Sequence, residues 1–457
     1  MGAFENILFN LPEVQAPTQK RLSFKVKLKW TLIILVLFFI LGLIPLYGLG
    51  GNALQQFEFL SVILGASFGS IISLGIGPIV TASIVLQLLN GSGLVKFDLT
   101  THDGKRRFQG IQKLLSVFFI ILEAVIYIQM GGLTPAAGIS PLILIFQLFL
   151  GGLLILYMDE VVSKWGFGSG ISLFIAAGVS QTIFIRAFNP LPSPNDPSGM
   201  SSGAIPSLIQ ALGQGNATHA TLMIATIAAT IIVFLLVVYA QAMRVEVPLS
   251  FGRVRGYGVR WPLHFFYTSN IPVILAAALI ANVQLFARLL SNAGINILGT
   301  FSGNTPVSGL AAWLFGPRIV ELAIKHSLTF SHILQALVYV LFMMLGAMVF
   351  SIFWVQTSGL DARSQANQMI SSGLQIPGFR KDIRVLERML NRYIWPLTVV
   401  GGLAVGLLAA LADIAGALAS GTGILLTVMI VYRLYEEIAQ QHMMDMNPMM
   451  RKFIAGG

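Results

Sequence analysis

Long apolar runs separated by short polar stretches dominate the chain between residues 30 and 438. A helix needs about 20 mainly apolar residues to cross the hydrocarbon core of a bilayer. The pattern supplies ten such runs, so we predict an all-α polytopic membrane protein with ten membrane-spanning helices. The predicted spans cover residues 30–49, 71–90, 109–130, 141–162, 171–189, 219–240, 266–288, 331–355, 393–414 and 421–438.

A shorter apolar run, from Phe57 to Ser70, precedes the second span and is too short to cross a bilayer. It leads into a Gly-Ile-Gly-Pro step at residues 75–78. Glycine relaxes the steric limits on the backbone, and Pro78 suits the first turn of a helix because its φ angle is already fixed. The pattern is typical of a re-entrant half-helix with a hinge, or of a fixed re-entrant turn.

The basic residues orient the predicted spans. Of the 28 Lys and Arg residues, all but Arg186, Arg288, Arg318 and Lys325 fall on the side that holds both termini. Basic residues near spans resist translocation, so this side is expected to be cytoplasmic.

The spans divide into two groups of five, which places the second group in the membrane with inverted topology. Such inverted repeats are common in transport proteins, although two five-span groups also arise by chance and no repeat of individual residues is visible. The expected divisions are a cytoplasmic segment at 1–29, an N-terminal half at 30–189, an external linker at 190–218, a C-terminal half at 219–438 and a cytoplasmic tail at 439–457.

Composition narrows the possible functions. The chain is 56% hydrophobic and 10% charged, and it has no cysteine, so a disulfide framework and a Cys-based metal site are excluded. No phosphate-binding glycine loop, paired metal-ligand spacing or catalytic triad is visible; we expect no enzymatic activity and no cofactor. Ionisable residues within the spans are few: Glu123 and Asp413 stand out, while Asp159 and Glu160 are expected to reach the membrane interface.

Two cytoplasmic loops are unusually long, at residues 241–265 and 356–392. Alternating polar residues with Gly and Pro in the first loop predict a short hairpin. The arginines of both loops suit contacts with phosphate groups, as in ribosomal RNA, or serve only to fix the topology.

β-Branched residues recur four positions apart in two spans, as Ile76 and Val80 and as Ile171 and Ile175. Residues four apart share one face of a helix. Ile and Val fill any membrane helix, so this spacing alone does not assign a function.

Six segments together resemble the SecY family, the central subunit of the protein-translocation channel, in its archaeal form. They read LGIGPIVTASIVLQLLNGSG, DGKRRFQGIQK, KWGFGSGISLFIAAGVSQTIF, FYTSNIPVILAAALIAN, IPGFRKD and GTGILLTVMIVYRLYEE, and they extend over nearly the whole chain.

The resemblance implies a protein-conducting channel that moves unfolded polypeptides outward and releases apolar segments sideways into lipid. It implies a plug half-helix at about 57–68 that contains Phe57, Phe59, Leu60, Ile63, Leu64 and Phe68, with Gly69, Gly75 and Gly77 as a mobile joint. It implies a pore ring of Ile76, Val80, Ile171, Ile175, Ile274 and Leu426. It implies a lateral gate with Thr81, Glu123 and Asn282, and partner-binding arginines at Arg253, Arg255 and Arg380.

The same resemblance implies a multi-pass protein of the cell membrane. The expected partners are a SecE/gamma-type subunit, a small beta subunit, the ribosome, signal-bearing nascent chains and membrane lipid. Two alternatives remain at this stage: a secondary transporter of small solutes, which needs a polar mid-membrane site, and an insertase without a central pore.

Overall fold

The computed structural model describes most of the chain. The described residues are 11–19, 22–52, 65–91, 94–95, 97, 101–192, 200–251, 258–268, 271–292, 294–302, 305–371, 374–375 and 382–446.

Ten helices coincide with the ten predicted spans. Those of the N-terminal half are α2 (Phe24–Leu43), α4 (Gly77–Gly91), α5 (His102–Gln129), α6 (Pro141–Trp165) and α7 (Gly170–Phe188). Those of the C-terminal half are α9 (Ala217–Ala242), α10 (Ile271–Asn292), α13 (Phe330–Thr357), α15 (Ile383–Ile414) and α16 (Gly421–Met446). Within the described ranges, eight helices are long and apolar enough to cross a membrane on their own. The other two predicted spans are α4, which has 15 residues, and α16, which becomes charged from Arg433 onward.

Several predicted boundaries were wrong. Helix α2 begins at Phe24 rather than residue 30 and ends before Pro45, since the residue before a proline disfavours the helical conformation. Helix α15 begins ten residues before the predicted 393, because its charged first turns are helical although they are not apolar. Residues 71–76 form turns, so α4 begins at Gly77 and Pro78 occupies its first turn as predicted.

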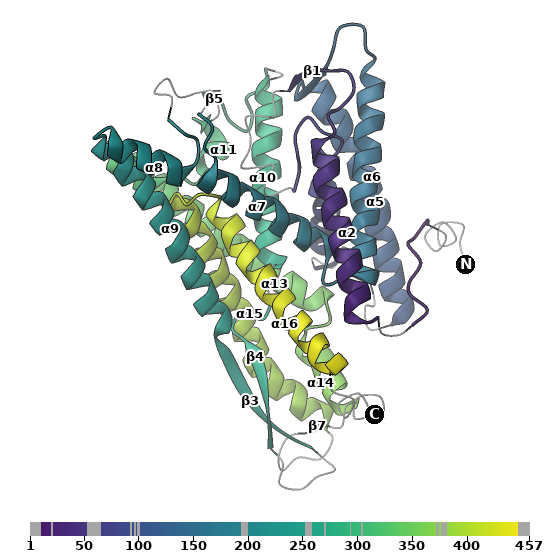
Figure 1. The fold of residues 1–457 in the computed structure, drawn as a ribbon. Coiled ribbons are helices and arrows are strands. Elements are labelled where there is room, and N and C mark those ends of the chain that lie inside the picture. Colours follow the sequence, from purple (N-terminus) through teal and green to yellow (C-terminus); the bar gives the residue numbers. More distant parts are fainter. Residues whose placement is uncertain are drawn as a thin grey trace.

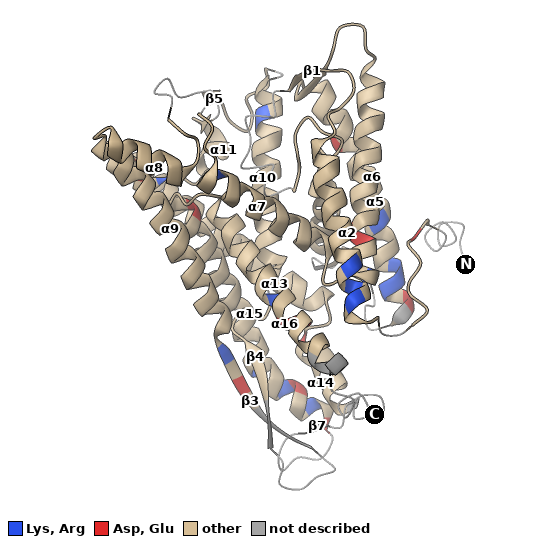
Figure 2. Cartoon of the chain, in the orientation of Figure 1, with Lys and Arg blue, Asp and Glu red and all other residues tan. Residues whose placement is uncertain are grey.

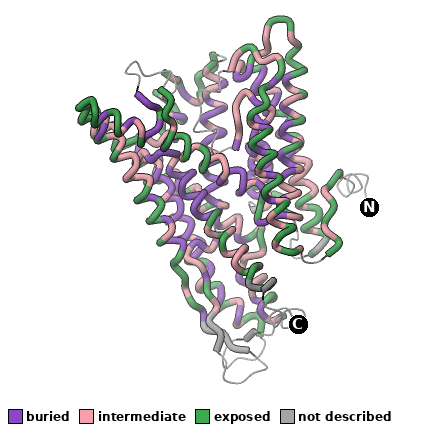
Figure 3. Tube along the Cα trace, in the orientation of Figure 1, coloured by how far each residue is buried: buried purple, intermediate pink, exposed green. Residues whose placement is uncertain are grey.

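The two halves meet along two seams. Helices α2, α5 and α6 lie on one side of the molecule and α9, α13, α15 and α16 on the other, with α7 and α10 between them (Figure 1). Helix α4 of the first half packs against α10, and α7 packs against α16. Buried residues follow the inner faces of these helices and exposed residues cover the outer faces (Figure 3), so the main core lies where the halves meet.

One end of the helix bundle carries most of the charge that the structure describes, and we call it the basic end (Figure 2). The hairpin predicted in loop 241–265 is confirmed there: β3 (Arg244–Phe251) pairs antiparallel with β4 (Gly258–His264). The second long loop supplies α14 (Ala362–Ser371) and β7 (Leu374–Gln375), which extends the hairpin to three strands. Arg244 of β3 forms an ion pair of 3.1 Å with Glu436 of α16, which holds the hairpin against the bundle.

Short elements complete the opposite end. They are α8 (Ala204–Gly213), which lies in the predicted linker 190–218, α11 (Gly309–Trp313), α12 (Ile319–Ile324), β1 (Leu49–Asn52) with β2 (Leu133–Pro135), and β5 (Phe301–Ser302) with β6 (Thr305–Pro306).

Candidate functional site

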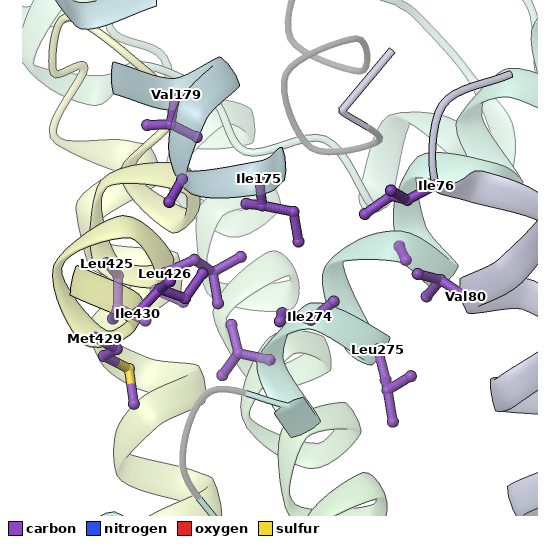
Figure 4. Packing of buried hydrophobic residues seen from close by; sticks show 14 of the residues in the cluster. Ile76, Val80, Ile175, Val179, Ile274, Leu275, Leu425, Leu426, Met429 and Ile430 are labelled. Atoms are coloured by element: carbon purple, nitrogen blue, oxygen red, sulfur yellow. The ribbon is translucent and has the colours of Figure 1, made fainter. Parts of the chain in front are cut away.

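An apolar cluster between four elements contains all six predicted ring residues. Val80 comes from α4, Ile274 from α10 and Leu426 from α16, while Ile171 and Ile175 come from α7 and Ile76 lies in the turn just before α4. Five of the six are buried, and the half-buried Ile171 packs against the same cluster. Figure 4 shows Val80, Ile175, Ile274 and Leu426 reaching into one region from α4, α7, α10 and α16, together with Ile76 from the turn before α4.

The six predicted ring residues are chemically alike. Their side chains are purely hydrocarbon, so they offer an ion nothing to replace its hydration shell, and an apolar constriction can close by excluding water. The cluster therefore has the chemistry that the predicted ring requires.

A cavity of about 720 Å³ lies on the basic side of the ring. Val80, Ile171 and Ile274 line it together with polar side chains that include Gln87, Lys105, Gln112, Ser172, Thr357, Arg433 and Glu437. A second cavity, of about 340 Å³, is lined by α2, α7 and residues 65–68. Three of the six predicted ring residues therefore border a cavity at the basic end that also carries polar and charged side chains.

The predicted plug falls mostly outside the described residues. Phe57, Phe59, Leu60, Ile63 and Leu64 are not described. The chain is described again at Gly65, where an added Cβ would lie 3.8 Å from Cγ2 of Ile76. Phe68 packs edge-on to the Tyr127 ring at 6.5 Å. Of the predicted joint glycines, Gly69 and Gly75 have left-handed φ angles of 97° and 57°, whereas Gly77 is the first residue of α4.

The structure brings the three predicted gate residues together at the seam between the halves. Asn282 Nδ2 of α10 donates to Thr81 Oγ1 of α4 at 2.8 Å. Thr81 Oγ1 lies 3.4 Å from Glu123 Oε1 of α5 and 2.8 Å from the carbonyl of Gly77. Asn282 and Glu123 are buried, so a polar cluster joins α4, α5 and α10 inside an apolar environment.

The gate and the ring share two helices. Thr81 directly follows Val80 on α4. Asn282 lies eight residues after Ile274 on α10, a little over two helical turns further along. Predicted gate and ring residues therefore lie on the same two helices, α4 and α10.

Arg253, Arg255 and Arg380 lie outside the described residues. The described elements nearest to them in the sequence are the β3–β4 hairpin and β7, and both lie at the basic end (Figure 1).

Three carboxylates near helix ends bind neighbouring elements. Asp159 Oδ1 accepts a 2.9 Å hydrogen bond from the backbone N–H of Ile171. Glu160 pairs with Lys113 of α5 and accepts from the backbone N–H of Val14 at 2.9 Å. Asp413 binds the first turn of α16 through the backbone N–H of Thr422, at 3.0 Å. These contacts join residues across loops, so no local pattern showed them.

The comparison with known families identifies this fold. The SecY family model matches residues 70–435, and the model described as the plug domain of Sec61p matches residues 36–69. The chain belongs to the SecY family. The resemblance drawn from the sequence motifs is thereby confirmed.

Relatives match over the full chain. The protein translocase subunit SecY of Methanothermobacter thermautotrophicus is 48% identical over 455 residues, which cover 99% of this chain and 98% of that protein. The protein of the same name from Methanocaldococcus jannaschii is 45% identical over 448 residues, covering 98% of each.

Solved structures agree. A structure described as a protein conducting channel matches with a TM-score of 0.86 at 44% identity, covering 98% of this chain and 99% of that one. Sec61 in a canine ribosome-channel complex from the endoplasmic reticulum matches with a TM-score of 0.82 at 43% identity, over 98% and 99% of the two chains.

Proposed function

We propose that this chain is the channel-forming subunit of a protein translocase in the cell membrane. It conducts unfolded polypeptides from the basic, cytoplasmic end to the outside and releases apolar segments sideways into lipid. It performs no chemistry of its own, so the energy comes from a partner such as a translating ribosome.

The observation that carries this proposal is the six-residue apolar cluster, three of whose members border a cavity with polar and charged side chains at the basic end. A small-solute transporter binds its cargo with polar or ionisable groups near the middle of the membrane. The ring offers only hydrocarbon, which grips an extended chain of any sequence by contact area. An insertase without a central pore would have no use for such a constriction.

The seam between α4 and α10 supports release into lipid. Its closed contacts include the Asn282–Thr81 hydrogen bond, and an interhelical hydrogen bond of this kind is worth on average about 0.6 kcal/mol in a membrane. A contact this weak adds little to closure, so the seam can yield to an apolar segment that binds between the helices.

Further parts of the proposal rest on the family. Residues 57–68 act as the plug, both termini are cytoplasmic, and the halves at 30–189 and 219–438 are clamped by a SecE/gamma-type subunit with a small beta subunit beside them. Arg253, Arg255 and Arg380 contact the ribosome, a partner that accompanies the canine Sec61 relative.

Site-specific cross-linking tests the channel directly, because the chain contains no cysteine. Single cysteines at Ile175 and Leu426 should form disulfides with a cysteine in a stalled secretory polypeptide. A cysteine at Leu235 of α9, whose side chain is 59% exposed on the outer face, is the matched control. Equal cross-linking at Leu235 and at the ring positions would overturn the proposal.

A further inference from the structure

Two helices that carry predicted ring residues begin with the same Ser-Gly step. Helix α7 follows the pattern Ser-Gly-Ile-Ser-Leu-Phe-Ile over residues 169–175, and α16 follows Ser-Gly-Thr-Gly-Ile-Leu-Leu over residues 420–426. In both, serine precedes the helix and glycine is its first residue. The seventh residue of each segment is a ring residue, Ile175 in one half and Leu426 in the other.

The two helix starts are bound in the same way. In α7 the second residue, Ile171, donates its backbone N–H to Asp159 Oδ1 at 2.9 Å. In α16 the second residue, Thr422, donates its backbone N–H to Asp413 Oδ1 at 3.0 Å. Each aspartate belongs to the preceding membrane helix, α6 or α15, so each contact joins two consecutive helices of one half.

Glycine permits both contacts. A Cβ on Gly170 would lie 2.6 Å from the Cα of Asp159, and a Cβ on Gly421 would lie 2.2 Å from the backbone nitrogen of Asp413. Both distances are shorter than any real contact of a Cβ atom. The first residue of each helix must therefore lack a side chain for the aspartate to reach the second.

Further hydrogen bonds orient the two carboxylates. Ser169 Oγ lies 3.5 Å from Asp159 Oδ1. Asp413 Oδ2 accepts from the Tyr339 hydroxyl of α13 at 2.7 Å and also from the hydroxyl of Thr422. Asp413 thus also links α16 to α13.

We propose that Asp159 and Asp413 are a matched pair of positioning residues that fix the register of the pore ring, one from each inverted half. The bound amide lies four residues, about one helical turn, before Ile175 or Leu426. Holding that amide fixes both the rotation and the height of the ring residue one turn further on. Asp159 acts at the basic end and Asp413 at the opposite end, as an inverted repeat requires.

This inference rests on the proposed role of the ring but makes a separate claim about what aligns it. An aspartate that only adds stability would lower the amount of folded protein without changing the ring. A positioning residue changes the packing of its own ring residue in protein that is still folded.

The test compares Asp→Leu with Asp→Asn at each position in the full chain with its partner subunits. Leucine keeps a similar size but loses the acceptor, whereas asparagine keeps an acceptor oxygen and binds helix N-termini as well as aspartate does. A single cysteine at Ile175 or Leu426 reports ring packing through its reaction with a small water-soluble maleimide. In the parent these positions are buried and should react slowly.

We expect Asp159→Leu to raise the reaction rate at Ile175→Cys several-fold, and Asp413→Leu to do the same at Leu426→Cys. The Asp→Asn variants should react at the parental rate. Asp361→Leu is the matched control, because Asp361 accepts from the backbone of Ser364 on α14, which carries no ring residue; it should change neither cysteine.

Parental rates in both Asp→Leu variants would overturn the inference, as would equal acceleration by Asp→Asn or by Asp361→Leu. If an Asp→Leu variant does not accumulate, Asp→Ala is measured in the same way and read by the same criteria. Resting ion conductance of Leu426→Ser is recorded in parallel. If Leu426→Ser has the same conductance as the parent, the ring is not the seal. The positioning claim is then still decided by the cysteine reaction rates alone.

Discussion

At the scale of single residues, apolar side chains of the same kind serve opposite purposes in this chain. Leu426 is fully buried in the ring, whereas Val431, five residues later on α16, has a side chain 52% exposed on the outer face. A hydropathy scale scores Leu426 and Val431 as similarly apolar, so it does not show which of the two is buried. A four-residue spacing of apolar residues does not show it either. The family motifs placed the ring and gate residues, whereas the pattern of apolar positions predicted only that helices were present.

Polar side chains in the ring should make the closed channel leak. We expect Ile175→Ser combined with Leu426→Ser to raise the resting ion conductance several-fold, because hydroxyl groups stabilise water in the constriction. The measurement is conductance across a planar bilayer, with Leu235→Ser on the outer face of α9 as the control. A double variant as tight as the parent would show that the plug alone seals the channel.

At the scale of elements, the sequence predicted the helices and the hairpin but missed contacts made between distant segments. Strand β7 has only two residues, and its existence depends on pairing with β3 more than a hundred residues earlier. The N-terminal segment was expected only to be cytoplasmic. The structure shows that its residues 12–15 form a strap across α5 and α6. Side chains of these helices, Lys113, Lys164 and Trp165, donate to backbone carbonyls of the strap, and no local pattern could reveal such contacts.

The strap should be held less firmly in acid. Glu13 pairs with Lys164 of α6, and the hydrogen bond from Lys164 holds the pKa of the Glu13 carboxyl below its usual value, against the opposing effect of burial. A lowered pKa stabilises the docked strap above the usual pKa of a free glutamate, and this contribution is lost as the pH falls through the lowered value.

Limited proteolysis within the strap over a pH series is the measurement. We expect cleavage to accelerate below about pH 4 in the parent, whereas Glu13→Gln should already be cleaved faster at pH 7 and show a smaller pH dependence. Lys113, which donates to the carbonyl of Pro12 at 2.6 Å, remains in both proteins. An identical pH profile for Glu13→Gln and the parent would exclude Glu13 as the sensitive group.

The loops at the basic end should bind the ribosome through charge. Arg253→Glu with Arg380→Glu is expected to weaken ribosome binding at low salt, with the difference from the parent shrinking as salt is added, because phosphate contacts depend on released counterions. Co-sedimentation over a salt series measures this. Arg318→Glu with Lys325→Glu, at the opposite end, should bind as the parent does; equal binding by the loop variant would leave those arginines a purely topological role.

At the scale of the whole molecule, the inverted halves were predicted from the parity of the spans, without any visible repeat of residues. The repeat exists at the starts of α7 and α16, but its aspartates precede the shared Ser-Gly by ten residues in one half and seven in the other. That difference in loop length hides the correspondence from a comparison at fixed spacing. Only the folded contacts align the two halves.

The seam between the halves should set how apolar a segment must be to enter lipid. Asn282 and Thr81 hold α10 and α4 together in the closed state, and when the seam opens these polar groups regain water from the channel. A leucine at position 282 packs well when the seam is closed, but unlike asparagine it gains no hydration when the seam opens. Asn282→Leu is therefore expected to stabilise closure, and a gain of about 1 kcal/mol lowers the open fraction several-fold.

An insertion assay over a graded Leu/Ala series of signal segments measures this threshold. With Asn282→Leu, segments of intermediate hydrophobicity should fail while strongly apolar segments still enter, because their binding energy offsets the added cost of opening. Gln284→Leu is the matched control: Gln284 is a buried amide two residues further along α10, and it donates to the carbonyl of Leu314 rather than across the seam. A threshold that stays in place, or that moves toward less apolar segments, would reduce the Asn282–Thr81 contact to a packing role and place the gate elsewhere.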